Sequence, residues 1–139
     1  GIPAGVFSGS TLPQNVESYY NQFVSKLLLT QALSATVGFF NGEGATADFP
    51  SNGFSLNSYL NALNTVKNGS DLSSLINDQF QVAFSKIELL DDNFTEQVTN
   101  DNIKMLETYD ELQRNVILMK VDMLQALSID VNYIDADGD

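Results

Sequence analysis

The sequence predicts an all-α fold, an antiparallel four-helix bundle in one domain that spans residues 1–139. Apolar residues recur at spacings of three and four in four separate segments, which is the pattern of amphipathic helices. Glycine and proline lie mostly between these segments, and the joints are brief, so successive helices are expected to run antiparallel. An extended N-terminal lead-in and a short extended acidic C-terminal tail complete the predicted architecture.

Residues 1–14 are expected to be extended, and the first helix is expected from Asn15 to about Phe40. The lead-in holds three of the nine glycines and two of the three prolines, which disfavour a helix. Asn41-Gly42 supplies a left-handed stop at the other end of the helix. The stripe expected to face the core comprises Val16, Tyr19, Tyr20, Phe23, Leu27 and Leu28, and the aromatic residues expected in the core also include Phe39, Phe40 and Phe49.

Two further helices are expected after a loop at residues 42–54. Ser55 is placed to cap a short helix that ends at Asn68-Gly69, and its apolar face comprises Leu56, Tyr59, Leu60, Leu63 and Val66. Ser70 or Asp71 then caps a third helix, which the segment 91–93 (Asp-Asp-Asn) breaks. Its stripe comprises Leu72, Leu75, Ile76, Phe80, Ala83, Ile87 and Leu90.

The last helix is expected from about Asn100 to Ser128, after one loose turn at residues 94–100. Its stripe comprises Ile103, Leu106, Tyr109, Leu112, Val116, Leu124 and Leu127. Residues 116–124 (VILMKVDML) are apolar nearly all round, which predicts a helix flanked on most sides by protein. Alternation of apolar and polar residues from Ile129 onward predicts a short extended segment before the acidic end.

The composition excludes several classes of function. The chain has no histidine and no cysteine, so it cannot hold a Ser-His-Asp triad, a cysteine nucleophile or a Cys/His zinc site. The net charge of −12 repels phosphate backbones, so nucleic-acid binding is not expected, and it favours cations, metal complexes or a basic partner. No stretch is expected to supply the roughly 20 apolar residues of a membrane span.

The terminal carboxylates Asp135, Asp137 and Asp139 alternate like ligands 1, 3 and 5 of an EF-hand calcium loop. The sequence stops before the turn glycine and the bidentate glutamate that such a loop needs. Three interpretations therefore stay open for these residues: a solvated acidic tail, a weak calcium site, or a site completed by ligands from a neighbouring domain.

Lys120 and Asp122 stand inside the apolar centre of the last helix, where an uncompensated charge is costly. Both are expected to have partners, but not each other, because residues two apart point to different faces. Asp110 and Arg114 are spaced for a surface ion pair. Glu107 and Glu111 have the spacing of half a carboxylate-bridged di-iron site, but bundles build such sites with histidine, so a solvated face is the favoured interpretation.

Five strings along the chain are distinctive: GIPAGVFSG (1–9), ESYYNQFVSKLLLTQALSA (17–35), FFNG (39–42), FSLNSYLNAL (54–63) and YDELQRNVILMKVDMLQALSIDVNYIDADGD (109–139). Together they resemble the C-terminal half of the imelysin family in the form found in Bacteroidetes. The resemblance implies a bacterial envelope protein, periplasmic or lipid-anchored, built from two helical halves. The family is classed as a peptidase family after one member, and other members accompany iron-uptake systems.

The family's GxHxxE signature lies in the N-terminal half, and a chain without histidine cannot contain it. The resemblance therefore implies a binding or scaffold domain that is not catalytic on its own and is linked to iron or other cation uptake. The alternative is the C-terminal half of a metallopeptidase, and a plainer option is a structural interaction module. The expected partner is the N-terminal half or a second copy, with iron or calcium as the candidate ligand.

The residues carried over to the pocket between the two halves are Ser8, Lys120 and Asp122, with Asp135, Asp137 and Asp139 as the candidate metal ligands.

Overall fold

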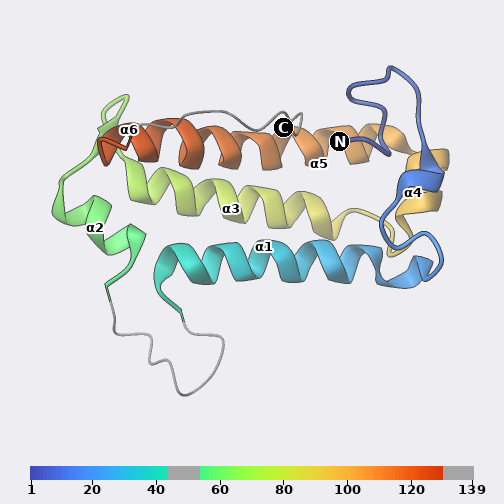
Figure 1. Cartoon of the computed structure of the whole chain (residues 1–139), viewed down its shortest axis with the longest axis horizontal. Coiled ribbons are helices and arrows are strands. Elements are labelled where there is room, and N and C mark those ends of the chain that lie inside the picture. The colour runs from blue at the N-terminus through green and yellow to red at the C-terminus, as the bar shows by residue number, and fades with distance from the viewer. Residues whose placement is uncertain (44–53, 130–139) are drawn as a thin grey trace.

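The structure is a computed structural model that describes residues 1–43 and 54–129. It confirms the all-helical class. Three long segments lie side by side in one antiparallel layer, with α3 (Leu72–Glu88) between α1 (Ser25–Asn41) and α5 (Asn102–Ile117) (Figure 1). The short helices α2 (Leu56–Ala62) and α4 (Phe94–Asn100) lie at opposite ends of this layer. The described residues thus contain three long helical segments and no fourth one alongside them.

The first helix begins ten residues later than the sequence predicts. Before α1 the chain makes only two short 3₁₀ turns, η1 (Pro13–Asn15) and η2 (Gln22–Val24). The hydroxyl of Ser25 donates to the carbonyl of Gln22, and Ser18 bonds Ser25 in turn. Serine side chains that bond nearby backbone compete with helical hydrogen bonds, which accounts for the irregular approach.

The predicted stripe of α1 is largely wrong. Tyr20 is fully exposed, Phe23 is 78% exposed, and Leu27 and Leu28 are at least half exposed, whereas Val16 is buried. The helix instead turns a different set of residues toward α3, namely Leu29, Leu33, Val37 and Phe40. The two stripes are offset along a helix that is apolar on both sides, so periodicity alone did not identify the buried one. Of the predicted core aromatics, Phe40 is buried, Phe39 is 72% exposed, and Phe49 lies outside the described residues.

The predicted caps are confirmed at three helix ends. Gly42 ends α1 in the left-handed conformation at φ 73°, and its N–H donates to the carbonyls of Gly38 and Phe39. Ser55 and Ser58 form a reciprocal capping box at the start of α2. Asp71 caps α3, which ends at Glu88, shortly before the predicted break.

Asn68-Gly69 does not end a helix, contrary to the prediction, because α2 already ends at Ala62. The two residues have φ of 53° and 83° and form the turn of a small hairpin between β1 (Val66–Lys67) and β2 (Ser70–Asp71). Asn-Gly is the preferred pair for such a two-residue turn because both positions need positive φ. Val66, predicted to lie on the α2 face, therefore belongs to β1 and is 65% exposed.

The last long segment is one continuous helical rod from Asn102 to Ala126, close to the predicted bounds. Its centre, η3 (Leu118–Met123), is π-helical, and α6 (Leu124–Ala126) follows it. Ile117 and Val121 are about half exposed, so the apolar centre is not enclosed by the described residues, contrary to expectation. Residues 94–100 form the seven-residue helix α4, capped by Asn93, where only a loose turn was predicted.

The core lies between the three long segments. Its fully buried side chains come chiefly from the predicted stripe of α3, and Phe40 and Phe80 meet edge to face with ring centroids 6.0 Å apart. In α5, by contrast, the buried residues are the polar Thr108 and Asn115, seven positions apart. The predicted tail from residue 130 onward lies outside the described residues.

Asp71 makes the start of α3 sensitive to acid. Its carboxylate accepts hydrogen bonds from both the hydroxyl (2.7 Å) and the backbone N–H (2.9 Å) of Ser74, and from the Ser73 hydroxyl (2.8 Å). The Ser74 hydroxyl bond is the largest cause of a pKa lowered below the usual 3.8. This stabilisation is present above the unfolded pKa and is lost as the pH falls through the folded one.

We therefore expect Asp71→Ala to lower the urea midpoint of unfolding at pH 7 and to change it less at pH 2.5, because the stabilisation by the carboxylate is lost as the pH falls through its lowered folded-state pKa. Urea titrations followed by circular dichroism at the two pH values measure this difference. An equal loss at both would show that the charge of the cap contributes nothing.

Candidate interaction surface

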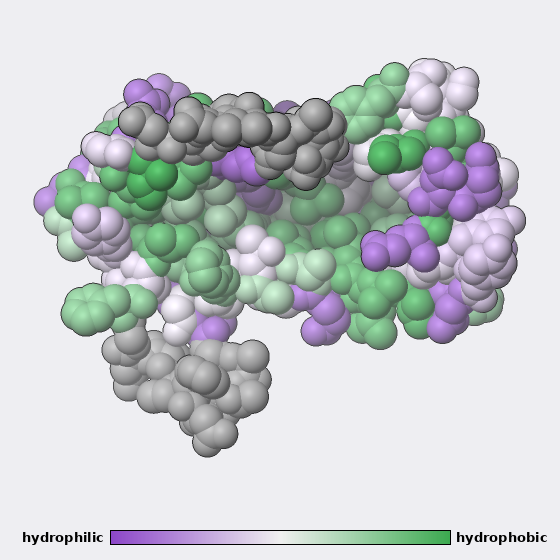
Figure 2. Space-filling model, in the orientation of Figure 1, coloured by the Kyte–Doolittle hydropathy of each residue, from purple (hydrophilic) through white to green (hydrophobic). Residues whose placement is uncertain are grey.

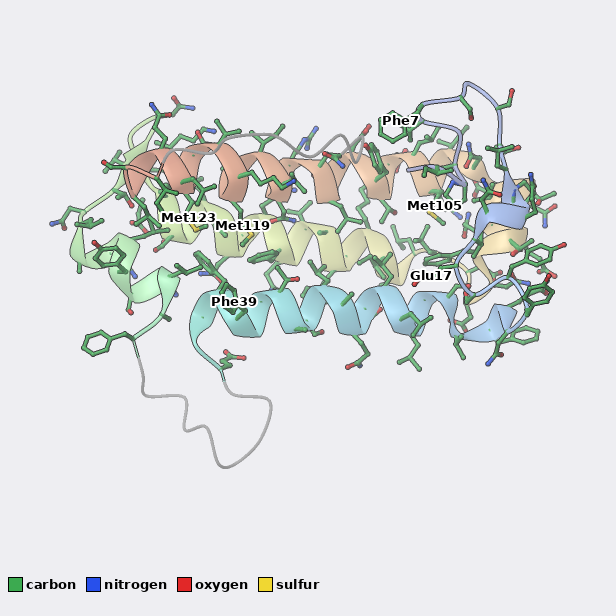
Figure 3. All side chains as sticks on the ribbon, in the orientation of Figure 1. Phe7, Glu17, Phe39, Met105, Met119 and Met123 are labelled. Carbon is green, nitrogen blue, oxygen red and sulfur yellow. The ribbon has the colours of Figure 1, made fainter. Side chains whose placement is uncertain are left out.

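One side of the helical layer is apolar, and no helix among the described residues covers it. Figure 2 shows that this side is mostly hydrophobic and is hollowed along its middle. Figure 3 places Phe39 of α1 and Met105 and Met119 of the last segment on this side. We define the open face as these residues and the apolar residues at helical spacing from them: Leu28, Ala32, Ala35 and Phe39 on α1, and Met105, Tyr109, Leu112, Val116 and Met119 on α5 and η3.

The α1 part of the open face has no charge. No Lys, Arg, Asp or Glu occurs between Lys26 and Glu43. The four α1 residues of the open face are all exposed, with Leu28 at 50% and Phe39 at 72%. A helix that faces water normally carries charged or strongly polar residues on that side. The side of α1 that belongs to the open face is therefore unusually apolar for a helix surface in contact with water.

By length and composition, the segment Gln22–Asn41 is apolar enough to cross a membrane, and only 17% of it is buried. This corrects the sequence-based expectation that no stretch approaches a span. The observation is weak support for a membrane helix, since the core helix of a folded domain can pass the same test.

Contacts in the structure tie α1 to the rest of the layer. The ammonium of Lys26 donates to the carbonyls of Glu88 (3.0 Å) and Leu90 (2.9 Å) at the end of α3. Asn41 donates to Asn77 of α3 at 3.0 Å. A span across a bilayer would break these bonds and withdraw Phe40 from the core.

A cavity of about 190 Å³ lies at the α4 end of the open face. Three helices and the N-terminal segment line it: Gly1, Pro3, Ala4, Val16, Glu17, Leu29, Phe94, Val98, Met105, Thr108, Tyr109 and Leu112. Figure 3 shows Glu17 and Met105 in this part of the molecule. The lining is apolar apart from the carboxylate of Glu17, two hydroxyls and the backbone of Gly1.

The sequence pattern does not predict this cavity. Phe94 and Val98 lie in the segment predicted as a loose turn, and Glu17 lies in the stretch predicted to be helical. The available signal was the pattern of Phe94 and Val98, four positions apart after the capping residue Asn93.

The predicted pocket residues do not meet. Ser8 lies in the exposed N-terminal loop, where its hydroxyl donates to the carbonyl of Ser10 (2.8 Å). Lys120 and Asp122 lie in η3, toward the opposite end of the layer (Figure 1). Asp122 has the partner that the sequence requires, the ammonium of Lys67 on β1. The candidate metal ligands Asp135, Asp137 and Asp139 lie outside the described residues.

The acids of α5 form ion pairs with bases instead of a metal site. Glu107 accepts from Lys86 at 2.8 Å, and this contact raises the pKa of Lys86. Glu111 accepts from Gln79 (2.8 Å) and from Arg114 (2.8 Å). The arginine thus pairs with Glu111 and not, as predicted, with Asp110. Within residues 1–43 and 54–129, no group of three His, Cys, Asp or Glu side chains is placed to hold a metal ion.

These polar pairs lie on the side of α5 that contacts α3. The amide of the buried Asn115 lies near the carbonyls of Gln79 and Glu111, and the hydroxyl of Thr108 donates to the carbonyl of Lys104 at 2.8 Å. Because α5 uses polar residues here, its apolar stripe is left only half-buried, facing the open side.

Comparison with known proteins finds no family model that matches the chain and no curated protein or solved structure significantly similar to it.

Proposed function

We propose that this chain is a binding and scaffold domain of a bacterial envelope protein, imelysin-like in kind, which docks a second helical layer on its open face. The observation that carries the proposal is α1, which has no charged residue after Lys26 and exposes Leu28 (50%) and Phe39 (72%) on the open face. Exposed apolar areas of this kind on soluble domains mark surfaces that another molecule covers. The domain contributes no catalysis of its own, and iron or calcium is the class of ligand that it helps to hold.

The form of the face suits a helix. Along α1, Leu28 and Phe39 flank the small residues Ala32 and Ala35, so that two large side chains border a shallow stretch. Helices pack by setting the side chains of one into the spaces between those of the other, at separations of 8–10 Å. On the opposite side of the hollow, Met105 and Met119 provide unbranched side chains that adapt to a partner's shape.

The preceding half of a longer protein is a better occupant than a second copy of this chain. Two copies would bring together two molecules of net charge −12 each, and like charges oppose association. The imelysin-like resemblance also implies a helical half before this one. With such a layer in place, α1, α3 and α5 would form one side of a larger helical bundle.

Residues 1–139 contain no cysteine, so thiol labelling of a cysteine introduced there can be measured on peptides cut from this part of the protein. Ala35→Cys places a thiol on the open face, and Ser34→Cys places a matched thiol on another side of α1, also exposed. We expect Cys-reactive reagents to label Ala35→Cys about tenfold more slowly in the whole gene product than in residues 1–139 alone, because labelling follows thiol exposure. Ser34→Cys should be labelled at similar rates in both.

Other occupants give different results. Protection within the isolated chain that grows with protein concentration would indicate a second copy, and protection only in the presence of phosphatidylcholine vesicles would indicate a bilayer. Either result, or equal labelling of Ala35→Cys in every sample, would overturn the proposed docking of a preceding half.

A further inference from the structure

The cavity at the end of the open face has the size of a receptor for one aromatic side chain. Its volume of about 190 Å³ exceeds the roughly 150 Å³ of an apolar protein cavity known to bind benzene. Leu29 of α1, Val98 of α4 and Leu112 of α5 give it apolar walls from three helices. The residues that dominate an interface usually fill a desolvated pocket of the partner.

The cavity lining contains few polar groups, and they differ in charge and in hydrogen bonding. The Thr108 hydroxyl already donates to the carbonyl of Lys104 at 2.8 Å. Among the described residues that line the cavity, Glu17 alone has a charged side chain, and this residue is exposed.

Within the described residues, Glu17 forms no ion pair with a Lys or Arg side chain. The chain has six Lys and Arg residues, and five of them form ion pairs with other acids: Lys26, Lys67, Lys86, Lys104 and Arg114. The sixth, Lys120, lies in η3, whereas the cavity is lined by residues no further along the chain than Leu112. A docking molecule that carries a positive charge would find in Glu17 a carboxylate without a salt bridge.

From this arrangement we infer that the docking helix inserts an aromatic side chain into the cavity and places a basic residue beside it, against Glu17. The inference rests on the proposed function, since it names the anchor of the same partner on the same face. The aromatic ring supplies buried apolar area, and the basic residue supplies the charge that an acidic chain with few bases lacks.

Three small probes imitate this anchor on residues 1–139 alone: phenethylammonium, 2-phenylethanol and phenylacetate, which share a ring and differ in charge. We expect each to shift the amide resonances of Val98, Thr108 and Tyr109 in ¹H–¹⁵N spectra at pH 8. Phenethylammonium should bind about two- to fivefold more tightly than 2-phenylethanol, the effect of an exposed ion pair, and phenylacetate should bind most weakly.

Glu17→Gln should remove the preference for phenethylammonium without preventing binding of the ring. Glu96→Gln is the matched control, because it makes the same charge change at an exposed acid of α4 that does not line the cavity. Equal affinity for the three probes, or a preference for phenethylammonium that survives Glu17→Gln, would contradict the inferred basic residue beside Glu17. The absence of saturable shifts at the lining residues would contradict the inferred insertion of an aromatic side chain.

The two tests fail separately. The probes act on the isolated chain, so a failure of the probes to bind would contradict the aromatic anchor but would not affect protection of Ala35→Cys. If Ala35→Cys is not protected while the probes still bind, the proposed docking of a preceding half is wrong and the cavity is still a binding site.

Discussion

Phe80→Ala is expected to destabilise the protein by about 3–5 kcal/mol, the usual cost of emptying a fully packed aromatic site. Phe80 is 1% exposed and meets Phe40 at the centre of the layer. The buried core cluster to which Phe80 belongs takes residues from α1, α2, α3 and η3, so no single segment can move in to fill the space. Because domains are typically stable by only about 5–15 kcal/mol, this loss should leave the variant close to unfolding at 37 °C.

Urea titration followed by circular dichroism measures the effect. Phe23→Ala makes the same chemical change at a side chain that is 78% exposed, and it should shift stability by less than about 0.5 kcal/mol. A loss below about 1.5 kcal/mol in Phe80→Ala would mean that the site collapses, and that the core is looser than the packing around Phe80 indicates.

Asn93→Ala is expected to destabilise the protein by about 2–3 kcal/mol, since it combines a lost cap with lost buried hydrogen bonds. The side-chain oxygen of Asn93 accepts from the N–H groups of Thr95 (3.0 Å) and Glu96 (3.3 Å), and its amide donates to Gln22 (3.1 Å). Asn93 is 1% exposed, so water cannot replace these bonds. It joins the start of α4 to the turn before α1.

The same variant should also loosen the cavity, because α4 supplies two of its lining residues, Phe94 and Val98. Hydrogen exchange of the α4 amides should accelerate more than exchange in α3. Asn100→Ala, at the exposed end of α4, is the matched control and should change stability by less than about 0.5 kcal/mol. If both variants exchange alike, Asn93 does not hold this corner of the fold.

The sequence predicted best where one side of a helix differs sharply from the other. In α3 the apolar stripe alternates with Asp78, Gln81 and Glu88, so the buried side could be identified in advance. Ser55, Asp71 and Gly42 were predicted as caps because their conformations depend on near neighbours in the chain.

Prediction failed where two sides of a helix are equally apolar or where a polar side is buried. Nothing in the periodicity of α1 separates Leu33 from Leu28, yet one is 7% exposed and the other 50%. In α5 the apolar stripe was expected inside, but Thr108 and Asn115 are the buried residues. Burial of such polar groups is favourable only when they find hydrogen-bond partners, which here include groups of α3.

The sequence by itself determined the helical class, the capped ends of the helices, the charge of −12 and the exclusion of histidine and cysteine chemistry. These depend on composition and on interactions between residues close in the chain. The tertiary structure decided which side of α1 is buried, how Lys67 compensates Asp122 and where the cavity near Glu17 lies. Those features arise from contacts between distant segments, and a linear pattern cannot show which segments will meet.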